Sequence, residues 1–273
     1  YILFFTDKGK CYCVKVYDIP EGGRAAKGRA IVNLIGCEPD EKVSAFISVK
    51  EFNDDHFVVM ATEKGIVKKT KLSAYSNPRK KGIYAVEIRD GDKLIEARVS
   101  TGDNDILLGT RNGKSIRFSE EQIRPSGRKT MGVKGITLSS EDDRLVGMLL
   151  IKREGTTVLV ATEKGFGKRT EISQYRAQKR GGKGVLTMKT TDKVGKMVTI
   201  KEVVDKDDLM IITNQGVLIR QPVSQIRAIG RATQGVKLIK LGEGTLVSSI
   251  TRIMSEEDSG DENNSTEPKG NTE

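Results

Sequence analysis

The chain repeats one pair of landmarks five times. A turn glycine is followed, 15 residues later in four copies and 14 residues later in one, by an arginine that opens a second turn ending in glycine. We call this second turn a corner. The turn glycines are Gly9, Gly65, Gly113, Gly165 and Gly216, and the corners are Arg24–Gly28, Arg79–Gly82, Arg128–Gly132, Arg180–Gly184 and Arg231–Gly235. So constant an offset indicates a repeat architecture, which constrains the fold before any single motif is considered.

Each repeat also contains four short segments typical of β-strands, separated by turn residues. The first is a solid apolar run that leads to a threonine, as in Ile2–Phe5, and predicts a buried central strand. The second follows the turn glycine, which permits a tight hairpin with positive φ. Fourth strands follow an acidic turn, as at Leu145–Ile151. Third strands are predicted directly after the corners, at Ala30–Leu34, Ile83–Ile88, Val133–Leu138, Val185–Met188 and Val236–Leu241.

The spacing of the repeats predicts the fold class. The threonines after the first strands, Thr6, Thr62, Thr110, Thr162 and Thr213, are 56, 48, 52 and 51 residues apart. Four strands per step, with no ten-residue segment of helical periodicity, predict an all-β, propeller-like disc of four-stranded blades. The predicted blades span residues 1–50, 51–100, 101–152, 153–204 and 205–254 of one domain.

Basic side chains dominate these repeats. The chain has 47 Lys and Arg against 37 Asp and Glu, a net charge of +10. Residues 255–273 hold seven of the acids and one lysine, so residues 1–254 keep 46 bases and 30 acids, a net charge of +16. A surplus that large indicates a polyanionic partner rather than a merely solubilising surface. The acidic tail, 255–273, lacks large apolar residues, and we expect it to be disordered.

Residues for catalysis or metal binding are scarce. His56 is the one histidine, which argues against a histidine-based triad or metal centre. Cys11, Cys13 and Cys37 lack metal-ligand spacing and are predicted to be core thiols in a reducing compartment. Gly165–Arg169 lacks the first glycine and the closing Ser or Thr of a phosphate loop. We therefore predict no catalytic residue, metal or cofactor in this chain.

The cations cluster at the corners instead. A regular repeat would place equivalent corners around one rim of a disc, where their charges could follow a bent phosphate backbone. Few aromatic side chains accompany them, which favours sequence-independent binding to duplex DNA over stacking on single strands. The structural alternative is that each glycine only makes a turn and each arginine bridges two blades. The candidate DNA-binding residues are Arg24, Lys27, Arg29, Arg79, Lys80, Lys81, Arg128, Lys129, Lys134, Arg176, Lys179, Arg180, Lys183 and Arg231.

The most basic corner carries a family resemblance. Gln178-Lys179-Arg180-Gly181-Gly182-Lys183-Gly184 resembles the seven-residue box of the DNA gyrase A carboxy-terminal domain family, with lysine at 179 where the box usually has arginine. Residues 31–34, 61–65, 165–170 and 230–236 match the same family, and the resemblance covers residues 1–254. The family usually has six blades with its box in the first, whereas five repeats are visible here and the box lies in the fourth. The chain begins inside an apolar run without methionine, so we expect an upstream segment that includes a first blade.

The resemblance implies a β-pinwheel, a disc whose strands exchange between neighbouring blades and whose rim wraps duplex DNA. It implies DNA contacts at Gln178, Lys179, Arg180, Gly181, Gly182, Lys183 and Gly184. In the whole enzyme it implies ATP- and Mg²⁺-dependent negative supercoiling in the bacterial cytoplasm, where the gyrase B subunit, with a second A subunit, would complete an A2B2 assembly. The acidic tail would modulate wrapping.

Two alternatives remain open. One is the corresponding domain of topoisomerase IV, whose discs generally lack an intact box. The other is a propeller-type scaffold for protein interactions, which an aromatic content of only 5% disfavours.

Overall fold

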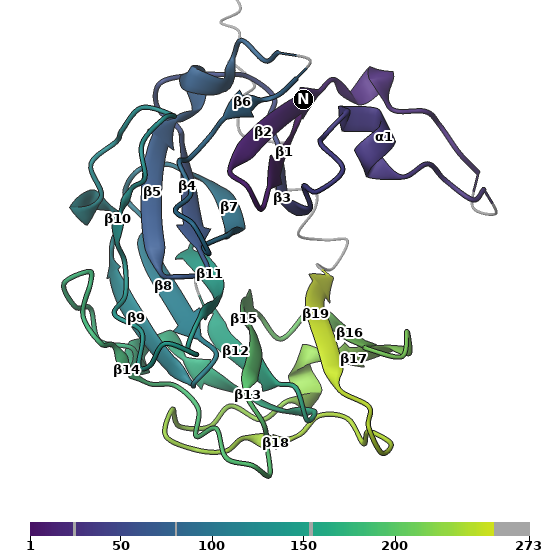
Figure 1. The fold of residues 1–273 in the computed structure, drawn as a ribbon. Helices are drawn as coiled ribbons and strands as arrows, with labels where there is room; N and C mark the ends of the chain where they lie inside the picture. Colours follow the sequence, from purple (N-terminus) through teal and green to yellow (C-terminus); the bar gives the residue numbers. More distant parts are fainter. Residues whose placement is uncertain (24–25, 80, 153–154, 254–273) are drawn as a thin grey trace, which may run out of the picture. The chain divides into compact units, whose positions relative to one another are not determined.

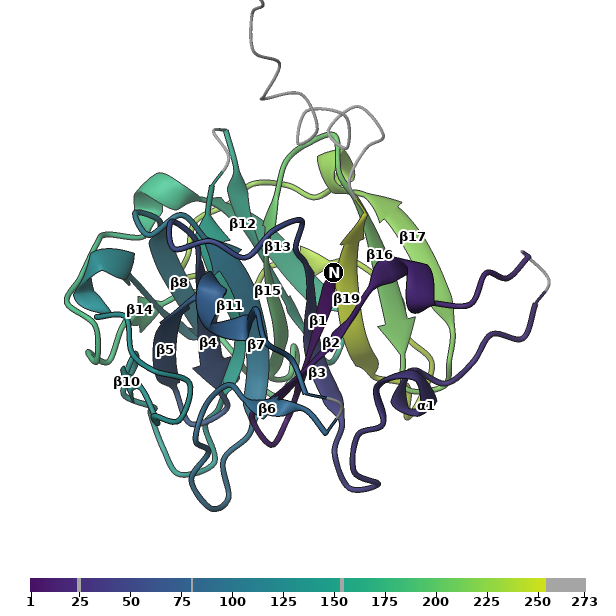
Figure 2. The same cartoon turned by 90° about the horizontal axis from the view of Figure 1, so that it is seen from above.

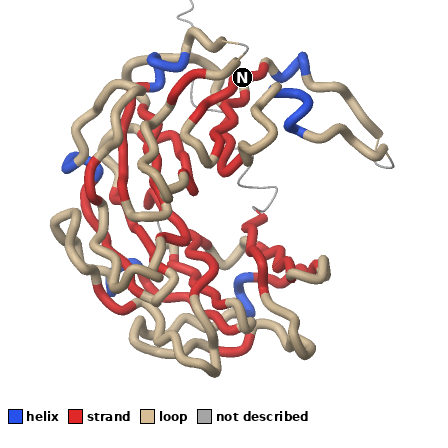
Figure 3. Tube along the Cα trace, in the orientation of Figure 1, coloured by secondary structure: helices blue, strands red, loops and turns tan. Residues whose placement is uncertain are grey.

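The computed structural model describes residues 1–23, 26–79, 81–152 and 155–253. Almost all of their regular structure is β, in antiparallel sheets joined by loops and short helical turns (Figure 3). The predicted all-β class is therefore confirmed. None of the helices in these ranges is long and apolar enough to cross a membrane. Arg24, Lys80 and the acidic tail lie outside the described residues.

Two compact units make up the described chain. The first unit contains Tyr1–Lys152 and Tyr175–Thr187, and the second contains 155–174 and 188–253. The box segment and the strand that follows it, Val185–Leu186, thus belong to the first unit, although the strand before them, Phe166–Glu171, belongs to the second.

The first unit contains three four-stranded sheets (Figures 1 and 2). Sheet A has the order β3 (Val43–Ser48), β1 (Ile2–Thr6), β2 (Lys10–Val14), β6 (Ile83–Tyr84). Sheet B has the order β10 (Val133–Lys134), β5 (Ile66–Lys71), β4 (Phe57–Thr62), β7 (Leu94–Ser100). Sheet C has the order β11 (Leu145–Ile151), β8 (Asp105–Thr110), β9 (Lys114–Ser119), β14 (Val185–Leu186).

The second unit contains two sheets. Sheet D has the order β15 (Met197–Val203), β12 (Thr157–Thr162), β13 (Phe166–Glu171), β18 (Val236–Lys237). Sheet E has three described strands in the order β17 (Leu218–Pro222), β16 (Asp208–Thr213), β19 (Val247–Ile253). One short α-helix, α1 (Ile31–Ile35), lies in the first unit, and the 3-10 turns of the two units are η1 (Val16–Asp18), η2 (Leu72–Tyr75), η3 (Glu120–Gln122), η4 (Ile172–Gln174) and η5 (Val223–Gln225).

Strand exchange links successive repeats. In sheets A to D the second strand pairs with a two-residue third strand that comes from the following repeat. The corner directly precedes that exchanged strand, so it lies on the sheet of the repeat before it. This is the exchange of strands between neighbouring blades that the family resemblance implies.

The third strands are shorter than the sequence predicts because each leaves the sheet edge after two residue pairs. The chain then crosses the hairpin turn of the preceding repeat, where the amides of Gly135 and Ile136 both donate to the carbonyl of Gly65. Gly65 has a φ of +81°, and a Cβ there would lie 2.8 Å from Cγ2 of Ile136. The turn glycine is thus required both by its own conformation and by the segment that passes over it.

One predicted strand is wrong. Ala30–Leu34 was expected to be a third strand, but Ile31–Ile35 forms α1, which ends at Gly36 with a φ of +61°. Later third strands pair with the second strand of a preceding repeat, and no such strand precedes this one in the described residues. The segment instead pairs its own main-chain groups, with the Asn33 amide donating to the carbonyl of Ala30 and the Gly36 amide to that of Val32. Ile35 is then buried against Phe4 and Tyr12.

The apolar cores lie between successive sheets. In the first unit, Leu3 and Phe5 of sheet A pack in one cluster with Val58 and Met60 of sheet B. A second cluster joins sheet B to sheet C. In the second unit, a third cluster joins sheet D to sheet E. Within the first unit β7 lies beside both β3 and β11, so these fourth strands share one side of the unit.

Candidate nucleic-acid interface

Three corners lie along one edge of the first unit. Strands β3, β7 and β11 stand at one edge of their sheets, and the exchanged strands β6, β10 and β14 stand at the opposite edge. Figure 1 shows β6, β10 and β14 on the side of this unit away from β7 and β11. Because each exchanged strand follows its corner, the corners Arg79–Gly82, Arg128–Gly132 and Arg180–Gly184 repeat along that edge. We call it the corner edge.

Most of the predicted DNA-binding cations are exposed. The exposed ones are Lys27, Arg29, Arg79, Lys81, Lys129, Lys134, Arg176, Lys179 and Lys183. Half-buried are Arg128, Arg180 and Arg231, each the arginine that opens its corner. Arg231 lies in the second unit, whereas the others lie in the first. Their DNA contacts remain a prediction.

Main-chain bonds fix the box on sheet C. The amide of Gln178 donates to the carbonyl of Arg117 at 2.8 Å, and the amide of Gly181 donates to that of Gly135 at 2.6 Å. The hydroxyl of Thr137 donates to the carbonyl of Gly181 at 2.7 Å. Gly184 has a φ of +68°, and a Cβ there would come within 2.3 Å of the carbonyl oxygen of Ser115. The last glycine of the box is therefore required by geometry alone.

The arginine of the box is itself part of this scaffold. Its Nε donates to the carbonyl of Gln122 at 3.0 Å, and its Nη1 donates to the carbonyl of Lys134 at 3.1 Å. The Gln122 side chain accepts a bond from the Arg180 amide at 2.9 Å. Because of these bonds the guanidinium of Arg180 lies against the protein, whereas Lys179 and Lys183 are exposed. The two lysines are thus the box cations best placed to meet a phosphate.

A second set of cations, not proposed as site residues from the sequence, is structural. Four residues stand four positions after a turn glycine and pair with a carboxylate in each case: Lys69 with Glu120, Arg117 with Asp105, Arg169 with Asp205 and Arg220 with Asp208. These pairs account for part of the positive charge that the sequence assigns to polyanion binding. Their constant distance of four residues from a turn glycine is the sequence signal that could have identified them as structural.

Two buried lysines were also missed. Lys68 and Lys168 stand three positions after Gly65 and Gly165, and their side chains are almost completely buried. Burial lowers the pKa of each amine to about 8, with a further lowering by Arg128 at Lys68 and by Arg231 at Lys168. Gln122 and Gln174, nine positions after Gly113 and Gly165, were likewise not predicted as site residues.

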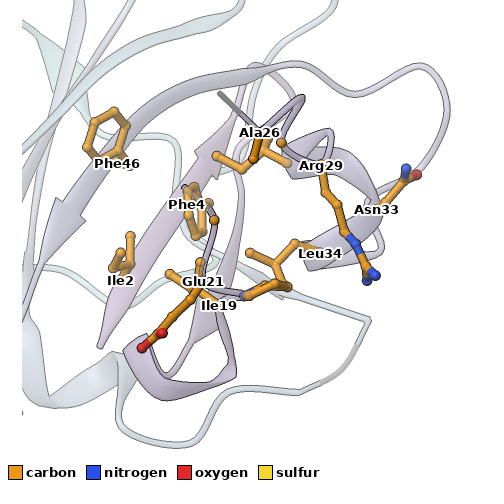
Figure 4. A pocket seen from close by; sticks show the side chains of 13 residues that line it. Ile2, Phe4, Ile19, Glu21, Ala26, Arg29, Asn33, Leu34 and Phe46 are labelled. Atoms are coloured by element: carbon orange, nitrogen blue, oxygen red, sulfur yellow. The ribbon is translucent and has the colours of Figure 1, made fainter. Parts of the chain in front are cut away.

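An apolar pocket of about 650 Å³ lies elsewhere on the first unit (Figure 4). Ile2 and Phe4 of β1 and Phe46 of β3 form part of its wall, with Leu34 of α1 among the other lining residues. Phe46 is 68% exposed, so α1 covers this face of sheet A only in part. Of the predicted site residues, Arg29 lines the pocket. The lining is too poor in titratable groups to suggest acid–base chemistry.

The histidine and cysteines behave as small structural groups. His56 hydrogen-bonds with Asn53 in a loop. Cys11 is buried, and burial raises the pKa of its thiol, which makes it unreactive. Among the described residues, no cluster of three His, Cys, Asp or Glu side chains could hold a metal ion.

Comparisons with known proteins agree with this architecture. The family model described as "DNA gyrase C-terminal domain, beta-propeller" matches residues 1–50, 56–101, 104–152, 156–203 and 207–253. The DNA gyrase A subunit of Staphylococcus epidermidis (strain ATCC 12228 / FDA PCI 1200) is 45% identical over 94% of this chain and 29% of its own length. The chain therefore spans less than a third of that relative.

Two solved structures share the fold. The C-terminal domain of DNA topoisomerase IV matches with a TM-score of 0.86 at 25% identity, over 93% of this chain and 79% of its own. The DNA gyrase A C-terminal domain matches with a TM-score of 0.81 at 23% identity, over 93% of this chain and 82% of its own. The β-pinwheel class is thus confirmed, and the higher identity to the gyrase relative favours gyrase over topoisomerase IV and over a protein-interaction scaffold. The chain belongs to the DNA gyrase C-terminal domain family.

Proposed function

We propose that this chain binds duplex DNA without sequence preference along its corners and helps to wrap it. The observation that carries the proposal is the corner edge of the first unit, where exposed lysines and arginines recur at equivalent places on three successive sheets. Cations at regular intervals suit a phosphate backbone, and each contact releases condensed counterions. No base-reading element is needed, since bendability of the duplex supplies the preference among sequences.

The wider proposal concerns the enzyme to which such a chain belongs. We infer that it is part of a type IIA topoisomerase that introduces negative supercoils using ATP and Mg²⁺ bound elsewhere. Its partners in the cytoplasm would be the gyrase B subunit, with a second A subunit, in an A2B2 assembly. The chain itself would contribute wrapping and no catalytic residue.

The test is the salt dependence of binding to a random-sequence duplex. We expect log K to fall linearly with log salt concentration, with a slope of about −0.9 for each phosphate neutralised. The double variant Lys179→Ala/Lys183→Ala should make that slope shallower by about 2 if each lysine meets one phosphate. Fluorescence anisotropy at several salt concentrations measures the slope.

The matched control removes the same charge at the other edge of the sheets. Lys42 and Lys93 are exposed and directly precede β3 and β7. Lys42→Ala/Lys93→Ala should leave the slope nearly unchanged. Equal slopes for the two double variants would show that binding depends on net charge alone and would refute the corner edge as the site. In the complete enzyme, the box variant should lose negative supercoiling and keep DNA cleavage.

A further inference from the structure

Beneath two of the corners lies a buried ammonium group. Lys68 of β5 is 1% exposed and Lys168 of β13 is 0% exposed. Each sits on the second strand of its sheet, under the corner contributed by the next repeat. A buried lysine needs partners for three N–H donors, and those partners reveal what it does.

Lys68 joins two consecutive exchanged segments of the first unit. Its Nζ donates to the carbonyl of Ala85 at 2.8 Å and to the carbonyl of Arg128 at 2.6 Å. Ala85 follows β6 and Arg128 opens the corner before β10. One ammonium group therefore holds the corner Arg128–Gly132 to the end of the preceding third strand.

Lys168 has the same place in the second unit. Its Nζ donates to the carbonyls of Gly230, at 2.6 Å, and Arg231, and to the hydroxyl of Thr233 at 3.1 Å. All three acceptors belong to or adjoin the corner Arg231–Gly235. The ammonium of Lys168 thus collects the inward-facing oxygen atoms of one loop.

These contacts orient the corner. A peptide group carries its C=O and N–H on opposite sides, so a carbonyl drawn inward to an ammonium turns the corresponding amide toward the surface. The acceptors in the bonds described are main-chain oxygens and, for Lys168, one hydroxyl; none is a carboxylate, although Glu87 lies near Lys68. Their charge is therefore not neutralised by a neighbouring acid in these contacts and adds to the positive field of the corner above.

We propose that Lys68 and Lys168 are positioning residues for polyanion binding, which hold the corners Arg128–Gly132 and Arg231–Gly235 with their carbonyls inward and their amides and cations facing a phosphate backbone. This inference rests on the proposed function, because duplex DNA is the polyanion concerned. Repeat 3 provides the contrast within the same chain: Ile116 stands three residues after Gly113, under the box, where no ammonium is present.

The experiment compares Lys68→Met and Lys168→Met with Ile116→Met in the full chain. Amide hydrogen exchange in residues 128–132 and 231–235 reports corner order without any DNA. We expect faster exchange in the corner above each substituted lysine, and no change there in Ile116→Met. We also expect duplex affinity to fall about tenfold per lysine at 0.1 M salt, the loss of roughly one phosphate contact.

The outcomes separate the two proposals. Unchanged exchange in both lysine variants overturns the positioning role, whether or not the chain binds DNA. Faster exchange with an unchanged duplex affinity overturns the link to polyanion binding. Failure of the unsubstituted chain to bind duplex refutes the proposed function, and the exchange data then judge the structural part alone.

A second test uses the unsubstituted chain, so it does not depend on whether the lysine variants fold. The ¹³Cε shifts of Lys68 and Lys168 are titrated with and without a random-sequence duplex. Phosphates placed over the corners should raise the pKa of both amines. Identical titration curves for the two lysines in free and bound chain would overturn the proposal.

Discussion

The corners Arg128–Gly132 and Arg180–Gly184 occupy equivalent places on neighbouring sheets of the first unit, yet they are held differently. Lys68 supports the first from beneath with a buried ammonium. The second lies over the apolar Ile116 and is held by Gln122, by Thr137 and by its own arginine. The corner Arg128–Gly132 is thus held by a cation buried beneath it, Lys68. The corner Arg180–Gly184 is held in part by its own cation, Arg180.

The difference shows that a cation in a basic repeat can either hold the main chain of a corner in place or remain exposed, where it can meet a phosphate. In the box, the bonds of Arg180 to the carbonyls of Gln122 and Lys134 favour a structural role. At the neighbouring corner, Arg128 donates a bond to the carbonyl of Tyr84 at 3.2 Å. The corner itself is held by the buried Lys68, which donates to the carbonyl of Arg128. Counting cations in the sequence cannot separate these roles.

The largest loss of stability is expected from substitutions at Lys69 and Arg117, whose main chains bond the segment that leads into each corner. The carbonyls of Lys69 and Arg117 accept bonds from the amides two residues before the corner arginines, at Ser126 and Gln178. The Lys69–Glu120 pair is buried, with side chains 5% and 0% exposed, and the pair at Arg117 is more open. Lys69→Met should cost about 3–5 kcal/mol because it leaves Glu120 buried without its ion-pair partner. Arg117→Met should cost about 1 kcal/mol.

Urea unfolding of the full chain measures both losses. The double variant Lys69→Met/Glu120→Gln removes the stranded charge, and it should recover much of the lost stability. Equal losses in Lys69→Met and Arg117→Met would contradict the difference in burial between the two pairs.

Substituting alanine for the last glycine of either corner should lower the stability by a similar amount. A Cβ on Gly132, which has a φ of +91°, would lie 2.5 Å from the carbonyl oxygen of Val67, and a Cβ on Gly184 would lie 2.3 Å from that of Ser115. We expect Gly132→Ala and Gly184→Ala each to cost about 2–3 kcal/mol, from strain and from displacement of the strand below. Gly127→Ala is the control, because no atom lies within 4 Å of its Cβ position. Thermal unfolding would show whether either closing glycine tolerates alanine as well as Gly127 does.

A pH dependence should belong to the lysine-supported corners. The pKa of Lys68 is lowered to about 8 by burial and by Arg128, with Glu87 opposing, and that of Lys168 to about 8 by burial and by Arg231. In the unfolded chain a lysine has a pKa of about 10.4. Between these values the unfolded state holds more protons, so stability rises with pH; below pH 8 both states are protonated and the slope vanishes.

Each lysine should contribute up to about 1.4 kcal/mol per pH unit within this window. The difference in unfolding free energy between the unsubstituted chain and Lys68→Met, measured at pH 7.5, 8.5 and 9.5, isolates the share of Lys68. Ile116→Met should keep the full slope. A difference that stays constant with pH would show that Lys68 titrates normally in the folded chain.

The sequence predicted what depends on local pattern. The central strands, such as Phe57–Thr62, and the positive φ of turn glycines such as Gly65 follow from apolar runs and from turn chemistry within a few residues. The third strands were overestimated in length because their pairing is set by a different repeat. The strand predicted at Ala30–Leu34 likewise depended on pairing with another repeat, and Ile31–Ile35 forms α1 instead.

The candidate site was predictable as a set of positions but not as a set of roles. The offset from turn glycine to arginine located the corners, and most of their cations are indeed exposed. Whether a given arginine faces solvent depends on acceptors far away in sequence, such as the carbonyl of Lys134 for Arg180. Lys68 and Lys168 were overlooked because a lysine in a strand is normally read as an exposed residue.

The smallest effect expected concerns Gln122, which bonds the box more closely than the equivalent Gln174 bonds the corner Arg231–Gly235. Its side chain accepts from the Arg180 amide and donates to the carbonyl of Gln178 at 3.3 Å. Gln122→Ala should cost about 1 kcal/mol, because water can replace these exposed bonds in part. Its equivalent, Gln174, accepts a longer bond, 3.3 Å, from the Arg231 amide above Lys168, so Gln174→Ala should cost less. Hydrogen exchange at Arg180 and Arg231 distinguishes the two; a larger change at Arg231 would mean that the buried lysine does not hold its corner.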